Sequence, residues 1–229
     1  MDLLRHYTSA YFRILYLYLM YKKPYFTVND QESVVEFMYA HPFVTLVGSR
    51  DNTPVVTQVP VLIDDRGGKF VLRGHIMRKS DHHLAFGQNP EVLVLFNGPH
   101  SYVSASWYSM RGVGSTWNYM TVHARGKISL MDEAHTLQLL TDLTHKYEDN
   151  QSKPEILENM NMEEYVQPMI KAIASFEIEL EDIYPLFKLS QNRDDESYKN
   201  IVAQLMSGED IDGITIAGEM MKLRPHLFE

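Results

Sequence analysis

The chain has 229 residues, 45% of them apolar and 22% charged, which is enough to bury a core and ordinary for a globular domain. It contains no cysteine, which excludes disulfides, thiolate metal sites and cysteine nucleophiles and fits a reducing cytoplasm. The net charge is −9, with a balance of +4 over residues 1–130 and −13 over residues 131–229. The first half therefore suits an anionic ligand, whereas the acidic second half disfavours nucleic acid.

The first 19 residues stand apart from the rest of the chain. Their apolar run, which continues to Met20, is much shorter than the roughly 20 residues that a membrane span needs. It also lacks a small-residue cleavage site, so neither a membrane span nor a secretory signal is expected. Because the residues after Met20 resemble a native start, we expect residues 1–19 to be an extension. The alternative is a short helix packed on a partner subunit.

The first expected element is a helix, because Asn29 can cap it, Glu32 follows three residues later, and Pro42 ends it. β-Branched runs separated by turns rich in Asp, Asn, Gly and Pro then predict three strands in an antiparallel meander. A short polar helix ending at Gly87 should follow. The ranges expected are Phe43–Ser49, Val55–Ile63 and Lys69–His75 for the strands and Lys79–Gly87 for this helix.

The remaining pattern predicts more strands and then a helical region. Strand spacing without alternating helices favours a closed or nearly closed barrel. The fold class expected is therefore mainly β with α (α+β), a barrel with peripheral helices and a helical C-terminal region. Strands are expected at Glu91–Phe96, Tyr102–Ser104, Trp117–Leu130 and Ser175–Ile183, a Gly-rich loop at Ser106–Ser115, and helices at 132–147, Met162–Ala172, Asp194–Met206 and Ile214–Leu223.

A candidate phosphate site lies where the strand before residue 78 ends. Arg78 offers a fork of donors, Lys79 a point charge, and Ser80 a hydroxyl at the entry of the short helix. The alternative interpretation is a solvated basic turn. The stretch is not a P-loop, and no GxGxxG occurs in the chain.

The stretch Gly98–Gly126 contains both tryptophans, three tyrosines and two histidines among many hydrogen-bonding residues. Such a mixture suits a flat ligand with polar edges, although a decorated sheet face is an equally open interpretation. Alternate residues of a strand share a face. One face should then hold Trp117, Tyr119, Thr121 and His123, and the other, which enters the barrel, Asn118, Met120, Val122 and Ala124.

Other chemistries are less supported. His82 and His83 point apart on a helix, no carboxylate has a convincing ligand spacing, and HExxH is absent, so no metal site is expected. Haem bound through His75, His100 or His123 stays open, because one axial histidine needs no spacing rule. No GxSxG elbow occurs, so the serines are interpreted as structural. Near the end, Lys188 and Arg193 should meet either a ligand or the acidic C-terminal region.

A series of motifs runs in order along the chain from Met20 to about Leu205. They are Met20-Tyr21, Pro24, Phe26, Gly74-His75, Arg78, Gly98-Pro99-His100, Tyr102, Ser106-Trp107-Tyr108, Thr116-Trp117-Asn118-Tyr119, Val122-His123, Gly126 and Phe187-Lys188-Leu189-Ser190-Gln191-Asn192. With these motifs the chain resembles the PaiB-type family of FMN-binding negative transcriptional regulators. The resemblance implies a split β-barrel of the pyridoxamine-phosphate-oxidase and flavin-reductase type, usually a homodimer with FMN in a cleft between subunits. After the motif Gly-His-x-x-Arg, which is Gly74 to Arg78 here, family members often have a small residue and then Asn-Pro. This chain has Lys79-Ser80-Asp81-His82 instead, so its contacts to the phosphate can differ from theirs.

Together with the residue chemistry, the resemblance implies a set of FMN-binding residues and no assigned catalytic residue. The alternatives to an FMN-binding regulator are a flavin-dependent oxidoreductase and a haem-binding protein of the same fold. Direct DNA binding is not expected, because the chain is acidic and shows no helix-turn-helix signal. The division expected is an extension at 1–19, the barrel domain at 20–193 and a helical region at 194–229. The cofactor-binding residues implied are His75, Arg78, Lys79, Ser80, Trp107, Thr116, Trp117, Asn118, Tyr119, His123, Lys188 and Gln191.

Overall fold

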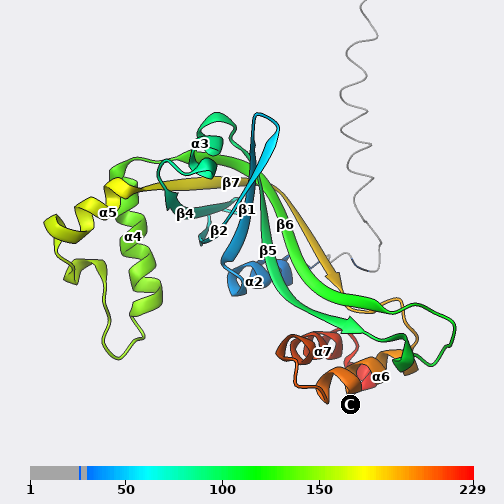
Figure 1. Cartoon of the computed structure of the whole chain (residues 1–229). Helices are drawn as coiled ribbons and strands as arrows, with labels where there is room; N and C mark the ends of the chain where they lie inside the picture. The colour runs from blue at the N-terminus through cyan, green and yellow to red at the C-terminus, as the bar shows by residue number, and fades with distance from the viewer. Residues whose placement is uncertain (1–25, 27–29) are drawn as a thin grey trace, which may run out of the picture. The chain divides into compact units, whose positions relative to one another are not determined.

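The computed structural model describes Phe26 and residues 30–229 (Figure 1). The expected extension at residues 1–19 and the cap at Asn29 lie outside the described residues. The helices are α2 (Gln31–Ala40), α3 (Asp81–Gln88), α4 (Glu133–Glu148), α5 (Gln167–Ala172), α6 (Asp195–Met206) and α7 (Ile211–Leu223). The strands are β1 (Phe43–Arg50), β2 (Thr53–Pro60), β3 (Leu62–Asp65), β4 (Phe70–Met77), β5 (Glu91–Val103), β6 (Thr116–Leu130) and β7 (Ile173–Lys188).

The strands form one sheet in the order β2-β1-β5-β6-β7-β4-β3, and the pairs β1–β2, β1–β5, β3–β4 and β4–β7 are antiparallel. The α+β class predicted from the sequence is confirmed. The predicted three-strand meander is wrong, because the second predicted strand is two strands. β2 and β3 stand at opposite ends of the strand order, each in a hairpin with a different neighbour.

The break in the predicted strand Val55–Ile63 falls at Val61. Pro60 has no backbone N–H, and the N–H of Val61 donates to the carbonyl of Pro42 at 2.9 Å rather than to the ladder. The chain can therefore leave β1 after β2 and pair with β4 through β3. The β-branched residues on both sides of Pro60 made the two strands look like one in the sequence.

β5 is one strand, although two strands, Glu91–Phe96 and Tyr102–Ser104, are expected from the sequence. The register with β1 covers only Leu93, Val94 and Leu95. Pro99 lies beyond this segment, so its missing N–H removes no bond to β1. From the sequence, the glycine and proline at 98–99 suggest that the strand is broken there. In the structure both lie inside one continuous strand.

The described chain divides into two compact units, and the long strands β5, β6 and β7 each have residues in both. The first comprises Pro99–Met120 and Pro185–Glu229 with the described residues before Glu32; we call it the helical unit. The second comprises Glu32–Gly98 and Thr121–Tyr184; we call it the sheet unit. The predicted boundary at residue 193 remains a prediction.

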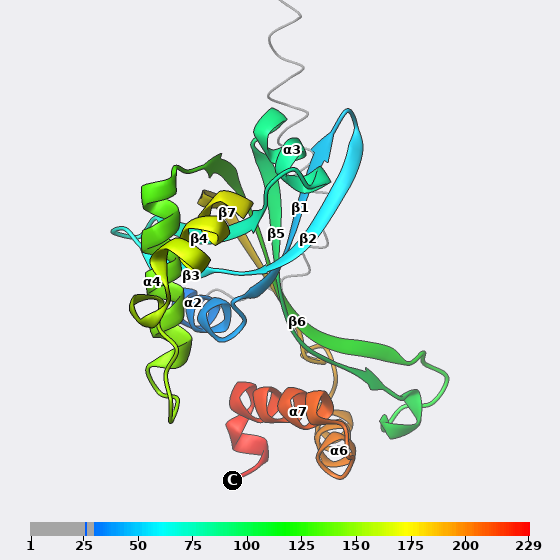
Figure 2. The same ribbon diagram turned by 60° about the vertical axis from the view of Figure 1, so that its left-hand side comes forward.

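The sheet unit has a buried core to which its strands and α2 contribute. Its innermost apolar side chains are Met38, Val44, Leu46, Leu72, Val94, Phe96, Val122, Phe176 and Ile178, none more than 1% exposed. α3 lies against the β1–β2 hairpin, and α4 and α5 lie side by side (Figures 1 and 2). A side-chain ion pair from Arg73 on β4 to Asp142 on α4, at 2.6 Å, ties that helix to the sheet.

Gly126 on β6 allows a close approach to β7. A Cβ atom at this position would overlap the backbone carbonyl of Glu179. Only glycine fits here without a shift of one strand, because a backbone neighbour cannot rotate away as a side chain can. This is the physical role of the glycine that ends the stretch Gly98–Gly126.

The helical unit is built on α6 and α7, which lie side by side in both views (Figures 1 and 2). The Tyr198 hydroxyl on α6 is buried and donates to the carbonyl of Met220 on α7 at 2.8 Å. Asp194 caps α6 by accepting from the N–H of Ser197. The expected helix starts at Asp132 and Asp194 are confirmed, whereas α7 begins at Ile211, three residues earlier than expected.

Candidate functional site

The predicted phosphate residues lie in the sheet unit, between β4 and α3. Ser80 is the N-cap of α3: its hydroxyl accepts from the N–H of His83 at 3.3 Å and donates to the carbonyl of Met77 at 2.7 Å. Lys79 adopts φ +63°, an uncommon conformation for a residue with a side chain. This conformation turns the chain from the end of β4 into the helix.

Arg78 and Lys79 supply positive charge at this turn. Arg78 is half-buried and Lys79 exposed, and neither forms an ion pair with any residue in the described ranges. The carboxylate of Asp81, in the first turn of α3, instead accepts from the backbone and ring nitrogens of His82 at 2.8 and 3.0 Å. A half-buried guanidinium without a carboxylate partner fits a bound phosphate, which it can contact through two donors.

His75 faces Ser175 across the β4–β7 pair. Its Nδ1 atom is buried and has no hydrogen-bond partner among the described residues. Burial lowers the pKa of His75, and it also lowers the pKa of His123, which is half-buried on β6. Both imidazoles are therefore neutral at pH 7, each able to donate through one nitrogen and accept through the other.

In the helical unit the structure brings together two motifs that lie far apart in the sequence. The ammonium group of Lys188, at the end of β7, donates a hydrogen bond to the hydroxyl of Thr116, at the start of β6. The same ammonium lies 6.0 Å from the ring centroid of Tyr119. Burial, and after it the charge of Arg193, lower the pKa of Lys188.

Asn118 and Gln191 are held by internal hydrogen bonds. Asn118 is fully buried, accepts from the hydroxyl of Ser190 at 3.0 Å, and places its amide nitrogen 3.5 Å from the sulfur of Met220. The side-chain oxygen of Gln191 accepts from the N–H of Leu189 at 2.8 Å, which closes the loop after β7. These contacts shape the loop, and the roles of both residues toward a cofactor remain predictions.

Aromatic side chains are exposed on β5 and β6 within the helical unit. Trp117 and Tyr102 are 52% and 47% exposed, with ring centroids 5.8 Å apart in an edge-to-face arrangement. The ring of His100 lies 6.0 Å from that of Trp117, and its Nδ1 is 3.3 Å from a carboxylate oxygen of Asp212. Large aromatic faces left open to solvent mark a surface that can stack on a flat ligand.

The predicted division of β6 into two faces holds with one exception. Asn118, Met120, Val122 and Ala124 are buried, as expected. Thr121, expected on the other face, is also buried, and its hydroxyl is satisfied by donating to the carbonyl of Phe96 at 2.9 Å. Trp107 is half-buried in a short 3-10 turn, Ala105–Trp107, which Ser104 caps.

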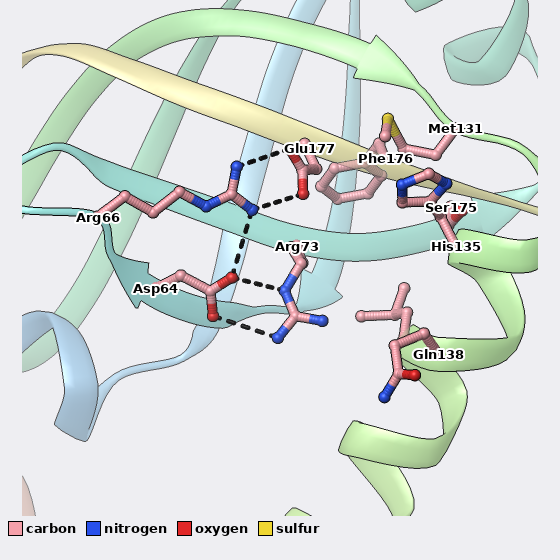
Figure 3. Close-up of a pocket in the computed structure, with 10 residues that line it drawn as sticks. Asp64, Arg66, Arg73, Met131, His135, Gln138, Ser175, Phe176 and Glu177 are labelled. Carbon is pink, nitrogen blue, oxygen red and sulfur yellow. Dashed lines mark hydrogen bonds and ion pairs between the residues drawn. The ribbon is translucent and has the colours of Figure 1, made fainter.

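A pocket of about 400 Å³ in the sheet unit was missed by sequence reasoning (Figure 3). Its arginines are already neutralised: Arg66 contacts both carboxylate oxygens of Glu177 at 3.1 and 2.6 Å, and Arg73 contacts both oxygens of Asp64 at 2.7 and 3.2 Å. The pocket therefore offers no free cation to an anionic ligand. Its lining residues are Asp64, Arg66, Arg73, Met131, His135, Gln138, Leu139, Ser175, Phe176 and Glu177.

The only feature of the sequence that indicated this pocket was the presence of charged residues within otherwise apolar strands: Asp64, Arg73 and Glu177. Which acid meets which base depends on the register: Arg73 stands opposite Glu177, yet its guanidinium binds Asp64 and Asp142. Within the described ranges, no helix is long and apolar enough to cross a membrane, and no three His, Asp or Glu side chains gather as a metal site.

Fold and site together define a class: an α+β protein on one antiparallel sheet, with a half-buried arginine before a helix N-terminus that forms no ion pair among the described residues, a feature that suits a phosphate ester. The family model described as "Putative FMN-binding domain" matches residues 20–182, and the chain belongs to this family. FMN is the cofactor that this membership assigns to it, and the PaiB-type resemblance is confirmed.

The chain is also similar to individual proteins of known sequence or structure. The chain is 33% identical over 190 residues to "Protease synthase and sporulation protein PAI 2" of Bacillus subtilis, covering 83% of this chain and 91% of the relative. Among solved structures, it is similar to the flavocytochrome Anf3 of Azotobacter vinelandii (TM-score 0.54, 16% identity, 71% of this chain and 69% of that one). It is also similar to the FAD- and haem-binding protein of Mycobacterium smegmatis (TM-score 0.51, 14% identity, 71% and 73%). At these identities the two structures support the split-barrel fold alone.

Proposed function

We propose that this protein is a PaiB-type regulator that holds FMN in a homodimer, with the cofactor at the subunit interface and its phosphate at Arg78 and Lys79. The observation that carries the phosphate assignment is the half-buried guanidinium of Arg78, which has no ion pair with any described residue and lies two residues before Ser80, the N-cap of α3. A phosphate dianion at this position would neutralise the charge and accept from both side chains.

The hydroxyl of Ser80 is a weaker candidate for a phosphate contact than the two cations. It already caps the N–H of His83 and donates to Met77, so a phosphate would compete with both bonds. The carboxylate of Asp81 also repels an anion at this helix start, although its hydrogen bonds to His82 occupy it. The assignment of the phosphate therefore depends on Arg78 and Lys79.

The ring system is proposed to contact residues of the helical unit. Trp117 presents an open aromatic face, and Tyr119, half-buried two residues later on β6, adds a second ring. Trp107, Asn118 and Gln191 would not offer free polar groups to the ring. They would shape the loops that carry the residues in contact with it. When bound, FMN supplies a ring that accepts and returns electrons, whereas these side chains position and cover it.

His75 is proposed to face the cofactor through Nδ1, which has no hydrogen-bond partner in the part of the chain that the structure describes. A buried ring nitrogen without a hydrogen bond is costly, and a polar ligand would relieve the cost. His123 shares its neutral state and its half-buried position, so both histidines offer a donor and an acceptor without a charge.

Regulation through direct DNA binding is not part of this proposal. The net charge of −9 disfavours contact with a phosphate backbone, so an effect on transcription would be indirect. A gel-shift experiment with promoter DNA at physiological salt tests this point, and specific retardation would contradict it.

No described side chain suggests a catalytic acid or base, so we assign no catalytic residue. A cytoplasmic location, expected from the absence of cysteine, belongs to the same proposal.

The test is the visible absorption spectrum of freshly purified protein, before and after addition of FMN. We expect flavin bands that stay with the protein on gel filtration, at one FMN per chain and at the mass of a dimer. Colourless protein that gains no flavin absorbance would overturn the proposal. A Soret band would identify haem instead, and bleaching of bound FMN by reduced nicotinamide would favour the oxidoreductase alternative.

A further inference from the structure

Three cations in the described part of the chain are half-buried and have no ion pair with a described residue: Arg78, Lys188 and Arg193. The first lies in the sheet unit and is assigned above to the FMN phosphate. The other two lie in the helical unit, at the end of β7 and in the loop before α6. Partly removing a cation from water without an opposite charge is costly, so these positions call for an anion.

Lys188 and Arg193 are each held against an aromatic face. The guanidinium of Arg193 lies 4.0 Å from the ring centroid of Tyr108, and the ammonium of Lys188 lies 6.0 Å from that of Tyr119. The hydroxyl of Thr116 accepts from Lys188 and fixes its position. The two cations also repel each other, since the charge of Arg193 lowers the pKa of Lys188 in addition to the effect of burial.

The nearest acids in the sequence are already engaged. Asp194 accepts from the hydroxyls of Ser109 and Ser197 at 3.1 and 2.7 Å and from the N–H of Ser197 at 2.9 Å. Asp195 is paired with Arg224, at 2.8 Å. The sequence left open whether Lys188 and Arg193 meet a ligand or the acidic C-terminal region, and within the described residues neither one pairs with an acid there.

We propose that Lys188 and Arg193, with the hydroxyl of Thr116, bind the carboxylate or phosphate group of a small molecule other than FMN. FMN carries one phosphate, whereas each of the two units holds half-buried cations that form no ion pair with a described residue. This step rests on the proposed function, which assigns the flavin phosphate to Arg78. It reassigns Lys188 and Thr116, which were expected from the sequence to contact the cofactor, to the acid group of a second ligand.

The experiment titrates FMN-loaded, full-length protein with inorganic phosphate and with succinate at constant ionic strength. Binding is followed by tryptophan fluorescence, because both tryptophans, Trp107 and Trp117, lie in the helical unit. We expect saturable binding at one site per chain without release of FMN. Lys188→Gln and Arg193→Gln should each weaken it about tenfold or more, as expected for a charged hydrogen bond. Lys188→Arg should restore most of it.

The matched control is Lys199→Gln, which removes an exposed charge from α6 in the same unit and should leave the affinity unchanged. Circular dichroism and the unliganded fluorescence spectrum check that each variant is folded. Absence of binding by both probes, or equal affinity in the wild type and both variants, would overturn the proposal. Release of FMN in proportion to bound phosphate would also overturn it, because the flavin phosphate would then occupy this site.

Arg78→Gln separates this inference from the proposed function. If the substitution weakens FMN binding but leaves phosphate binding unchanged, both proposals hold. If the protein binds no FMN but binds phosphate in a manner that depends on Lys188 and Arg193, the proposed function fails and the anion site stands. If FMN binds through Arg78 but neither probe anion binds, the anion site alone fails.

Discussion

The hydroxyl of Ser190 donates a hydrogen bond to the side-chain oxygen of Asn118 at 3.0 Å, and both side chains are buried. The two residues are 72 positions apart and belong to the two family motifs that meet in the helical unit. Ser190 also adopts φ +61°, where a side chain is strained and glycine is not.

Ser190→Ala should destabilise the helical unit by about 1–3 kcal/mol, because it leaves the buried oxygen of Asn118 without this donor. Ser190→Gly should cost less, because glycine adopts the positive φ freely. Urea unfolding followed by tryptophan fluorescence measures both, since the two tryptophans report on this unit. A greater loss for glycine than for alanine would contradict the interpretation.

Tyr108→Phe should leave stability unchanged or raise it by up to about 1 kcal/mol. The hydroxyl of Tyr108 is buried without a partner among the described residues, so its removal relieves an unsatisfied group. Phenylalanine keeps the ring that Arg193 contacts. The matched control is Tyr198→Phe, expected to cost about 1–3 kcal/mol because it removes the donor to the carbonyl of Met220. Thermal unfolding compares the two, and equal losses would refute the distinction.

Gly126→Ala should destabilise the sheet unit by about 1–3 kcal/mol or more, because the added methyl overlaps the backbone of Glu179. The comparison is Gly87→Ala, inside α3, where the nearest atom to the new methyl, from Leu130, is 3.9 Å away. Alanine is a better helix former, so this change should stabilise by up to about 1 kcal/mol. Circular dichroism during denaturation measures both. Equal effects of the two substitutions would show that β6 and β7 do not approach closely.

Arg78→Gln should weaken FMN binding about tenfold or more and leave riboflavin binding nearly unchanged, because riboflavin lacks the phosphate. Arg125→Gln, which removes an exposed arginine from β6 in the same unit, is the matched control and should change neither affinity. Flavin fluorescence titration gives both constants. Equal weakening for FMN and riboflavin would place the guanidinium at the ring or ribityl chain instead of the phosphate.

The stability of the sheet unit should fall as the pH drops below the unfolded histidine pKa of about 6.5. Burial lowers the folded pKa of His75, so between the two pKa values the unfolded state binds a proton that the folded state does not. His75→Gln should reduce this slope by up to one proton. His145→Gln should change the slope of stability against pH in the opposite direction. Asp149 and Glu158 raise the pKa of His145, so the stability that this histidine contributes is lost as the pH rises through that pKa. Urea unfolding from pH 5 to 8 distinguishes the two, and identical slopes for wild type and His75→Gln would contradict the argument.

Local chemistry determined much of the secondary structure from the sequence alone. Helix starts at Asp132 and Asp194 were predictable because a short acceptor side chain satisfies a free N–H within its own turn. The alternation along β6 identified Met120, Val122 and Ala124 as buried, since successive side chains of a strand point to opposite faces. The run Arg78-Lys79-Ser80 marked the start of α3 for the same local reason.

Only the tertiary structure decided which distant residues meet. The partners of β2 and β3, the bond from Lys188 to Thr116 and the ion pairs around Arg73 join segments whose spacing in the sequence carries no signal. Whether a cation is neutralised also depends on these contacts. Arg73 binds two acids, whereas Arg78, five residues later on the same strand's end, is left without an ion pair among the described residues. Burial and pairing are properties of the folded chain, and they distinguish a structural arginine from one available to a ligand.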